Sequence, residues 1–597
     1  MCGIFGIIGD ESGVNGRLDQ AARSLFHRGP DSHQILRLPG LSLGHTLLSV
    51  IGESPITQPI HSHDGRGLLT YNGEIYNYIE LLRDDPELRA ACQGRLTTDT
   101  VVLVEGLRLY GEGFLRQLNG MFAFCYHDLE SGETLLVRDR LGIKPLFYSA
   151  APGAFIFASE TQAVRVLSGK PFTPDPEAFY SYIRFRYPIA ARSFDLNIRQ
   201  VLPGQLLRIG RNGEVRTIQW WVNQTAGGFT GTYDEALGTV QELLESSIEL
   251  RMRSDHGFCT FLSGGLDSSL LTALASKNKN RLDTYSIGVA GAPDLDESVY
   301  AAAVAAKLGT HHHPYSLSSD GYRAHHSAFV AALKEPLPVP NQVALRALSE
   351  DVSLTHRVVL SGEGADEVFA GYGRIFLLPH DWKAIEEQRN RPGALQAKLL
   401  KRYGPELPNS FDELFIERYA YTTHRFAVDA MKPLFGNIDG ALLRNSVEAS
   451  ILQIARSLEG DDPFNRMLLL FQNVHLPGLL YRVDAATMAN SVEARVPFLD
   501  HRLVEFANTL PIDLKIRTLK PRSSLTHLLA DEISEIHDVP KAILKDQGRN
   551  LLPEGIADRR KMGFPIPPAF YMPQSKDGMA DYQAWTERNL ELWAASV

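Results

Sequence analysis

A short stretch near the middle of the chain has the composition of a phosphate-binding turn. Ser263 to Ser269 read Ser-Gly-Gly-Leu-Asp-Ser-Ser, between an apolar run at 257–262 and a helix-forming run at 270–275. The apolar run is expected to be a buried parallel strand. Adjacent glycines let the backbone approach a ligand, and Ser268 with the first N–H groups of the helix can hold an anion. Asp267 adds a hard oxygen ligand suited to Mg²⁺.

This turn is not a P-loop, because it lacks the Lys that contacts the β- and γ-phosphates of a triphosphate. The alternative is an ordinary strand-to-helix turn in which Ser and Asp cap the helix. A second acidic turn, Ser361-Gly-Glu-Gly-Ala-Asp-Glu367, follows the expected strand 357–360. Parallel sheets bind ligands at the C-terminal ends of their strands, which suits this turn to a metal and an activated intermediate. Helix capping is again the alternative, but it leaves the paired glycines unexplained.

The N-terminus could provide a nucleophile. The chain opens Met1-Cys2-Gly3-Ile4-Phe5, and removal of Met1 would give Cys2 both a thiol and an α-amino group that serves as its base. The alternation of glycine and apolar residues after Cys2 predicts a buried strand. A disordered start with an incidental Cys is the alternative, and it fits this alternation poorly.

Polar turns and short strands follow in the first third of the chain. Asn72-Gly73 is the strongest tight-turn dipeptide, and Asp99 precedes a helical run at 101–107. The other stretches of this kind are His27–Asp31, Leu118–Phe124, Val137–Phe147 and Ala158–Glu160. After a linker rich in Gly and Thr, an amphipathic helix is expected from about Asp234 to Met252, followed by alternating strands and helices.

Composition excludes several classes of protein. The chain has 597 residues, a net charge of −10, and 22% charged and 44% hydrophobic residues, which implies two or more globular domains. There is no basic block for nucleic acid, no apolar run near the ~20 residues of a membrane span, and no signal-peptide pattern. We therefore expect a cytoplasmic protein.

Cysteine and histidine usage gives no strong metal signal. The four cysteines are too few for a disulfide framework and have no Cys-x-x-Cys spacing. The tract His311-His312-His313 could bind a metal, but it lies where a helix should end and a strand begin. We expect solvated or ATP-adjacent polar residues there rather than a zinc site.

These motifs resemble those of known families. The stretch 263–269 resembles the pyrophosphate loop of the ATP pyrophosphatase superfamily, and the first third resembles the class II glutamine amidotransferases. With Tyr481–Asp500 and Arg559–Pro565 added, nearly the whole chain resembles the glutamine-dependent asparagine synthetases. The resemblance implies ATP and Mg²⁺ as cofactors, and glutamine, ATP and a carboxylate such as aspartate as small-molecule substrates.

The same resemblance implies roles for residues in the first domain. Cys2 would attack the glutamine side-chain amide, and the Asn72 side chain with the Gly73 N–H would form the oxyanion hole. Glu74 and Asp99 would hold the α-ammonium group of glutamine. Each residue type suits the role that it is given.

In the second domain the resemblance implies that Asp267 and Asp366 are the Mg²⁺ ligands. It also implies that Glu363 faces the acyl-adenylate and that Lys561 neutralises the departing pyrophosphate. Ile287 would line the adenine pocket. The predicted ATP-binding residues are Leu262, Ser263, Gly264, Gly265, Asp267, Ser268, Ile287, Ser361 and Gly362.

One position departs from the family pattern. Gly44-His-Thr-Leu-Leu-Ser-Val50 resembles Gly-His-x-Arg-Leu-Ser-Ile, in which the Arg binds the glutamine α-carboxylate, but this chain has Leu47 there. An unpaired, half-buried carboxylate could cost ~2–5 kcal/mol. Weak use of glutamine is the expectation.

We expect an α+β glutaminase domain of stacked antiparallel sheets with flanking helices at 1–215, a linker at 216–232, and an α/β parallel-sheet ATP pyrophosphatase domain with a helical C-terminal part at 233–597. The expected reaction is amidation of a carboxylate, foremost aspartate, through an acyl-adenylate. Alternatives are another carboxylate, such as a sugar acid or specialised metabolite, lactam or lasso-peptide type ring closure, or a non-catalytic binding homologue. No nucleic-acid or membrane partner is expected, and a homodimer stays open.

Overall fold

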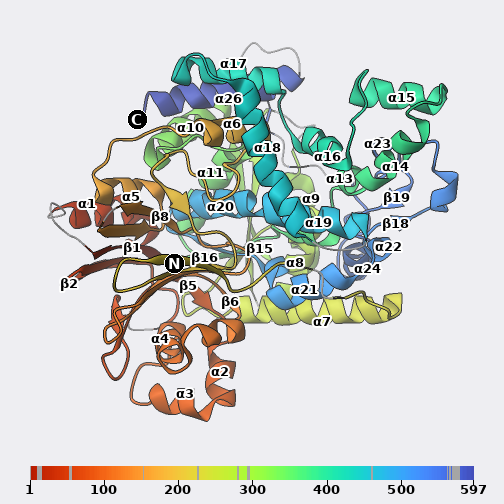
Figure 1. Cartoon of the computed structure of the whole chain (residues 1–597). Coiled ribbons are helices and arrows are strands. Elements are labelled where there is room, and N and C mark those ends of the chain that lie inside the picture. The colour runs from red at the N-terminus through yellow and green to blue at the C-terminus, as the bar shows by residue number, and fades with distance from the viewer. Residues whose placement is uncertain are drawn as a thin grey trace.

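The computed structural model describes residues 2–9, 16–52, 57–151, 153–224, 227–277, 281–291, 296–458, 462–560, 563, 566–567, 570 and 578–597. Its N-terminal third occupies the lower left of Figure 1, and the largely helical remainder extends above it and to the right. Among the described helices, none is both long and apolar enough to cross a membrane.

Two six-stranded antiparallel sheets form the N-terminal part. The first has the order β10 (Arg199–Gln200), β8 (Phe147–Ala151), β9 (Ala154–Ala158), β1 (Cys2–Gly9), β3 (Leu41–Leu47), β2 (Ser32–Leu38). The second has the order β12 (Val215–Gln219), β11 (Gln205–Ile209), β7 (Thr134–Arg138), β6 (Gly120–Asp128), β5 (Gly67–Ile75), β4 (Ile60–His61). β1 is central in the first sheet and β5 lies near one edge of the second.

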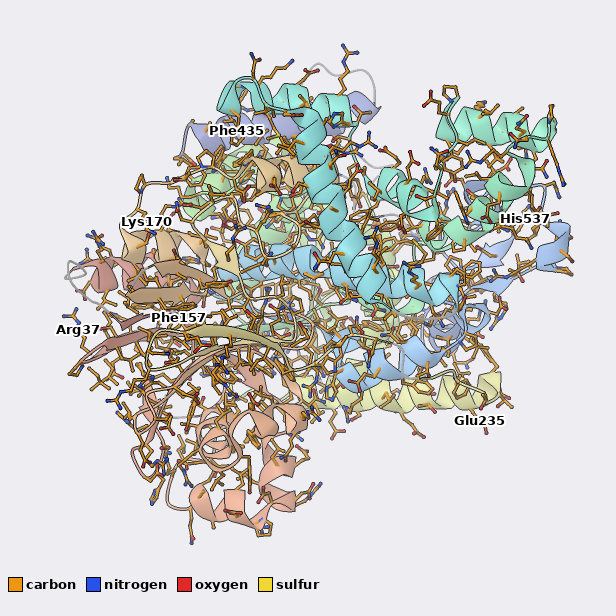
Figure 2. The ribbon with its side chains drawn as sticks, viewed as in Figure 1. Arg37, Phe157, Lys170, Glu235, Phe435 and His537 are labelled. Carbon is orange, nitrogen blue, oxygen red and sulfur yellow. The ribbon has the colours of Figure 1, made fainter. Side chains whose placement is uncertain are left out.

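The inner faces of the two sheets share one core. Ile4 and Leu43 from the first sheet pack in the same cluster as Leu68 and Leu136 from the second, as alternation along each strand requires. Phe157 is fully buried there (Figure 2). Helices α1 (Arg17–Ser24) and α5 (Thr161–Ser168) pack on the outside of the first sheet, and α4 (Asp99–Tyr110) on the second. The four layers hold the start of β1 in a fixed position.

A five-stranded parallel sheet forms the centre of the second part. Its order is β15 (His311–Leu317), β14 (Asp283–Val289), β13 (Cys259–Phe261), β16 (Val358–Leu360), β17 (Glu493–Arg495). Every pairing in it is parallel. The helices that contact these strands or lead into them are α7 (Tyr233–Arg251), α8 (Leu266–Ser276), α9 (Ser298–Leu308), α11 (Asn341–Ser353) and α20 (Leu476–Met488). The expected pyrophosphate turn thus follows β13 and the second acidic turn follows its neighbour β16.

The rest of the chain is mostly helical. The remaining elements are α2 (Tyr78–Asp84), α3 (Pro86–Ala91), α6 (Pro176–Phe185), α10 (Ser319–Leu333), α12 (Ala365–Phe369), α13 (Gly373–Phe376), α14 (Leu378–Gln388), α15 (Ala394–Tyr403), α16 (Phe411–Tyr419), α17 (His424–Phe435), α18 (Gly440–Ser457), α19 (Pro463–Val474), α21 (His501–Thr509), α22 (Ile512–Lys515), β18 (Arg517–Thr518), α23 (Ala530–Ile533), β19 (Asp538–Val539), α24 (Ala542–Arg549) and α26 (Gly578–Ala594). Helix α26 was not among the predicted elements; it packs against α10 through the buried Trp585.

The predicted fold class is confirmed. Antiparallel sheets come first, a parallel sheet follows, and the C-terminal part is helical. The helix expected from about Asp234 to Met252 is α7, which begins one residue earlier behind a capping box of Thr232 and Glu235. The domain limits 1–215, 216–232 and 233–597 stay a prediction.

Two candidate active sites and the contact between them

Cys2 begins the central strand of the first sheet, and its surroundings are polar and buried. Its backbone N–H donates to Asn72 Oδ1 at 3.0 Å, which joins β1 to β5 in the other sheet. Among the described residues Asn72 Nδ2 is buried and has no hydrogen-bond acceptor. A buried amide donor without an acceptor carries a desolvation cost of about 1–3 kcal/mol, so a ligand oxygen would be favoured there. This is what an oxyanion hole requires.

The backbone conformation and the close neighbouring strand at position 73 require glycine. Its φ is +155°, and a Cβ would lie 2.1 Å from the Met121 carbonyl oxygen on β6. A side chain at this position would collide with the neighbouring strand, so only glycine fits here. The tight turn predicted at Asn72-Gly73 is wrong, because both residues lie inside β5 and pair with β6. Of the two predicted oxyanion donors, Asn72 is hydrogen-bonded to Cys2, and Gly73 is the next residue along β5.

Two buried carboxylates lie beyond Asn72. Asp99, at the start of α4, accepts from the Tyr71 hydroxyl at 2.8 Å and from the Ile75 N–H at 3.1 Å. Glu74 is buried too, and among the described residues its Oε2 has no donor. Burial, and then the nearby charges of Glu493 and Asp99, raise the pKa of Glu74 well above its usual range. A bound ammonium group would relieve this repulsion, which fits the role predicted for Glu74.

Leu47 lies directly across from Cys2, because the two residues are paired in the β1–β3 register. Its side chain is only 8% exposed. The guanidinium group of the nearby Arg28 already pairs with two other carboxylates: it donates to Glu160 and to Asp484 at 2.9 Å each. The absence of the family's Arg at position 47 is therefore not made up for by Arg28.

The second candidate site begins at the turn after β13. The Ser268 hydroxyl contacts the Ser263 N–H at 3.1 Å and the Ser263 hydroxyl at 3.0 Å, which closes the turn. Gly264 has φ of +77°, and a Cβ would lie 2.5 Å from the Ala301 nitrogen of α9. Helix α8 starts behind Gly265 with no side-chain cap. Its first N–H groups are thus oriented toward the turn, as anion binding needs.

The two predicted metal ligands converge on one cation. Lys541 Nζ lies 2.8 Å from both carboxylate oxygens of Asp267 and 2.9 Å from Asp366 Oδ1. Burial opposes a charge on Lys541, but the two carboxylates outweigh it and raise its pKa. Carboxylates spaced to share one ammonium group have the spacing and the hard oxygen donors to share a divalent cation, so the donor set fits Mg²⁺.

These residues line a cavity of about 760 Å³ at the C-terminal edge of the parallel sheet. The predicted residues that line it are Leu262, Ser263, Gly265, Asp267, Ser268, Ile287, Ser361, Gly362, Glu363 and Asp366. Gly264 does not line it. Nine basic and five acidic described side chains face the same space, a surplus of positive charge that suits a polyanionic ligand.

Within this cavity Glu363 forms an ion pair with Arg482 Nη2 at 2.6 Å. Lys561, predicted to act on pyrophosphate, lies outside the described residues. Its neighbour Arg559 donates to the Gly264 carbonyl at 3.3 Å and pairs with Glu297. Sequence reasoning missed Lys541 and assigned no role to Arg559, although it singled out the stretch Arg559–Pro565. The one available signal for Lys541 was a lone charged residue before the apolar run Ala542-Ile-Leu544.

Buried ion pairs join the two halves of the protein. Arg28 bonds the Cys2 carbonyl at 3.2 Å and reaches Asp484 on α20. Arg495 on β17 pairs with Glu493 at 2.5 Å and lies 3.7 Å from Glu74 on β5. Buried polar contacts therefore connect Cys2 to α20 and β5 to the parallel sheet, and the sequence did not predict them.

The comparisons with known proteins agree with this architecture. Residues 239–594 match the family model described as Asparagine synthase, and residues 1–221 match the Glutamine amidotransferase domain. Among curated relatives, asparagine synthetase [glutamine-hydrolyzing] 1 of Bacillus subtilis is 28% identical over 95% of this chain and 87% of its own length. A putative asparagine synthetase of Mycobacterium tuberculosis is 29% identical over 95% and 88%. Amidase chyE of Penicillium rubens is 28% identical over 85% and 80%.

The family resemblance read from the motifs is thereby confirmed, and so is the prediction of an enzyme. A pair of antiparallel sheets in which Cys2 begins a central strand, and a parallel sheet followed by the turn 263–269, occur here in one chain. The match to the family model covers more than half of the sequence. This chain belongs to the asparagine synthase family and is a glutamine-hydrolysing carbon–nitrogen ligase.

Proposed function

We propose that the protein converts aspartate to asparagine, with ATP cleaved to AMP and pyrophosphate and ammonia taken from glutamine. The observation that carries the proposal is the meeting of Asp267 and Asp366 around one cation, at the mouth of a phosphate-binding turn. This arrangement suits a reaction at the α-phosphate. The relatives named asparagine synthetase support aspartate as the acceptor.

In the glutaminase half, the Cys2 thiolate attacks the side-chain amide of glutamine, and Asn72 Nδ2 with the Gly73 N–H stabilises the oxyanion. Glu74 and Asp99 hold the α-ammonium group. Burial raises the pKa of the Cys2 thiol, so the proton must leave to a neighbouring base, the α-amino group that removal of Met1 would free. The tetrahedral intermediate collapses with cleavage of the C–N bond, the protonated α-amino group gives its proton to the leaving ammonia, and a thioester stays on Cys2. Water then hydrolyses the thioester to glutamate and frees the thiol.

In the synthetase half, the substrate carboxylate attacks the α-phosphorus of ATP, with pyrophosphate as the leaving group. Ser263, Ser268 and the N-terminus of α8 bind phosphate oxygens, and Ile287 lines the adenine pocket. Asp267 and Asp366 would hold Mg²⁺, which would offset phosphate charge. Lys541 and, from the family pattern, Lys561 stabilise the departing pyrophosphate. Glu363, oriented by Arg482, faces the acyl-adenylate that ammonia converts to the amide.

A second candidate keeps this chemistry and changes the acceptor. The fungal relative named an amidase favours it, and so does Leu47, because weak glutamine binding suits a free or substrate-borne amine. Sugar acids, specialised metabolites and internal ring closure are acceptors of this type. A non-catalytic binding role has less support, since the buried Asn72 Nδ2 has no acceptor among the described residues and Asp267 and Asp366 share one cation, as the catalytic proposal requires.

Incubation of the protein with ATP, Mg²⁺, glutamine and a panel of carboxylic acids tests both candidates. We expect pyrophosphate, AMP and asparagine only when aspartate is present. Asp267→Asn should stop pyrophosphate release with either glutamine or ammonium and serves as the matched control. Aspartate-independent pyrophosphate release with another acid would transfer the proposal to that acid, and substrate-dependent ADP would reject the mechanism.

A further inference from the structure

The edge of the parallel sheet opposite the synthetase cavity carries a cluster of histidine and carboxylate side chains. Asp283 is the first residue of β14 and His311 the first of β15, and the two are partners in the strand register. His313 follows two residues later, on the same face. The carboxyl-terminal part of β14, with Ile287, reaches the cavity about 13 Å farther along the strand. The cluster is therefore separate from the proposed catalytic residues.

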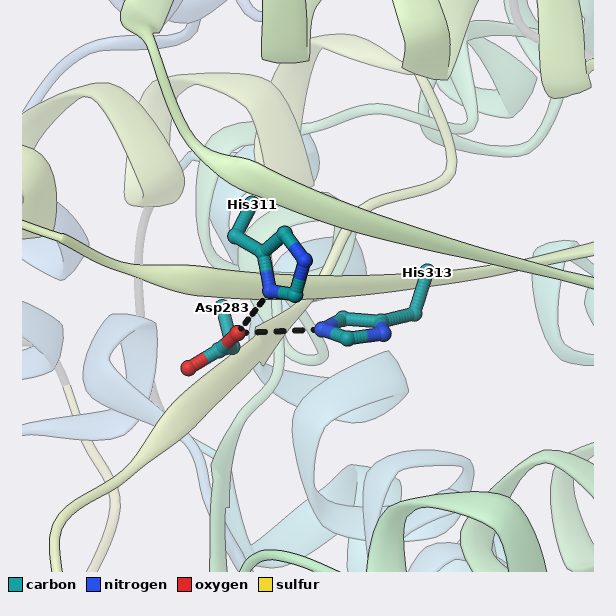
Figure 3. Close-up of side chains that lie close together, drawn as sticks. All are labelled: Asp283, His311 and His313. Atoms are coloured by element: carbon teal, nitrogen blue, oxygen red, sulfur yellow. Dashed lines mark hydrogen bonds and ion pairs between the residues drawn. The ribbon is translucent and has the colours of Figure 1, made fainter.

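The ligand atoms of this cluster are close together. His311 Nδ1 lies 2.7 Å and His313 Nε2 lies 3.0 Å from the same oxygen, Asp283 Oδ1 (Figure 3). All three atoms lie within 4.8 Å of one another. Tetrahedral zinc with bonds near 2.0–2.1 Å needs ligand atoms about 3.3 Å apart. Small rotations of the side chains would open the observed hydrogen-bond distances to that value.

Neighbouring groups orient these side chains. His356 Nε2 lies 3.5 Å from the second oxygen of Asp283, and its Nδ1 contacts the Thr355 hydroxyl at 2.9 Å. The His313 ring stacks on Tyr285 at 4.5 Å between centroids. Supporting contacts of this kind are usual around metal ligands, because they fix the ring and carboxylate orientations.

The cluster is open to solvent. The His311 side chain is 48% exposed, that of His313 30%, and that of Asp283 23%. Two imidazoles and one carboxylate prefer zinc and similar transition metals over Mg²⁺, and exposure leaves a fourth position for water. His312 points to the opposite face, where its ring contacts the hydroxyls of Thr284 and Ser286.

We propose that Asp283, His311 and His313 form a zinc-binding site, with His356 as a positioning residue for the carboxylate. The sequence alone favoured solvated or ATP-adjacent histidines here, and the 48% exposure of His311 agrees with solvation; the proposal adds a bound ion. Tyr285 both stacks on His313 and lines the synthetase cavity, so two side chains in series, His313 and Tyr285, would link the bound ion to the cavity wall.

The test uses the full chain without a polyhistidine tag, stripped with a chelator and then titrated with Zn²⁺ by calorimetry. We expect one ion per chain. His311→Ala, and Asp283→Asn as a variant of the same size, should each weaken binding at least tenfold, and His356→Ala by about tenfold. His312→Ala and His33→Ala, on the exposed strand β2, are matched controls that should keep wild-type affinity.

Cobalt gives an independent readout, since Co²⁺ bound by His₂Asp in tetrahedral geometry absorbs strongly in the visible range. The absorption should appear in the native protein and be lost in folded His311→Ala. Saturable binding that survives in the double variant Asp283→Asn/His313→Ala, or loss that is equal in His312→Ala, would overturn the proposal. So would the absence of any stoichiometric binding, which would leave a hydrogen-bonded cluster only.

Discussion

Replacing Leu47 by Arg tests whether the glutamine site lacks its carboxylate-binding cation. Leu47 is buried across from Cys2 in the β1–β3 pair, so an Arg there begins next to the nucleophile and can extend toward bound glutamine. One charge-assisted hydrogen bond contributes about 1.5–3 kcal/mol. Since about 1.4 kcal/mol is tenfold in affinity, the KM for glutamine should fall roughly 10- to 100-fold.

The substitution also has a cost. A guanidinium group at a position that is 8% exposed loses several kcal/mol of hydration before glutamine binds. We therefore expect a lower melting temperature in the absence of glutamine and a partial recovery when glutamine is added.

Steady-state glutaminase kinetics on three proteins decide the question. Leu47→Met is the matched control, because it keeps volume and adds no charge, and it should leave the KM unchanged. If the native protein already has a KM in the low-micromolar range, and Leu47→Arg does not improve it, the reasoning is refuted. Another cation then holds the carboxylate, and Arg495, 3.7 Å from Glu74, is the first to examine.

Three further predictions concern the rest of the machinery. Cys2→Ala should remove glutamine-dependent amidation and retain amidation with ammonium. Ser at the buried Cys92, Cys125 or Cys259 should retain both the glutamine-dependent and the ammonium-dependent activity. Loss of the ammonium reaction in folded Cys2→Ala would contradict the assigned role. Lys541→Met removes the ammonium group proposed to stabilise the departing pyrophosphate. It should lower the rate of AMP formation at least 100-fold while glutamine hydrolysis continues, as single-turnover assays can show. Burial alone would raise the pKa of Glu160, but the charges and hydrogen bonds of His27 and Arg28 outweigh it and lower the pKa to about 2. The ionised carboxylate therefore stabilises the fold above pH 4.5, and this contribution is lost as the pH falls toward 2. Urea unfolding of Glu160→Gln should lack that part of the pH dependence.

The sequence predicted the local features of both sites. Strand–turn–helix patterns located Asp267 and Asp366, and the Gly-apolar alternation located the strand after Cys2, because these signals lie within a few residues. It did not predict Lys541, whose partners lie far away along the chain. It also missed β17, since Glu493-Ala-Arg495 is charged at both ends and only its ion pair explains its burial.

The sequence also could not predict what surrounds the histidine tract His311–His313. Its residue types were noticed, and the start of a strand there is confirmed. Whether His311 and His313 meet a carboxylate depends on which strand pairs with β15 and in which register. That pairing, with Asp283 opposite His311, is a property of the sheet and has no local pattern.

The position of β17 has a consequence for biosynthesis. β17 completes the parallel sheet against β16, yet it is made long after β16 leaves the ribosome. At about 5–20 residues per second, β16 waits on the order of ten seconds with an unpaired apolar edge. The glutaminase sheets can form during that interval, but Arg28 must wait for Asp484. Chains released before Arg495 should therefore aggregate, and nascent chains paused in this interval are where a chaperone would bind.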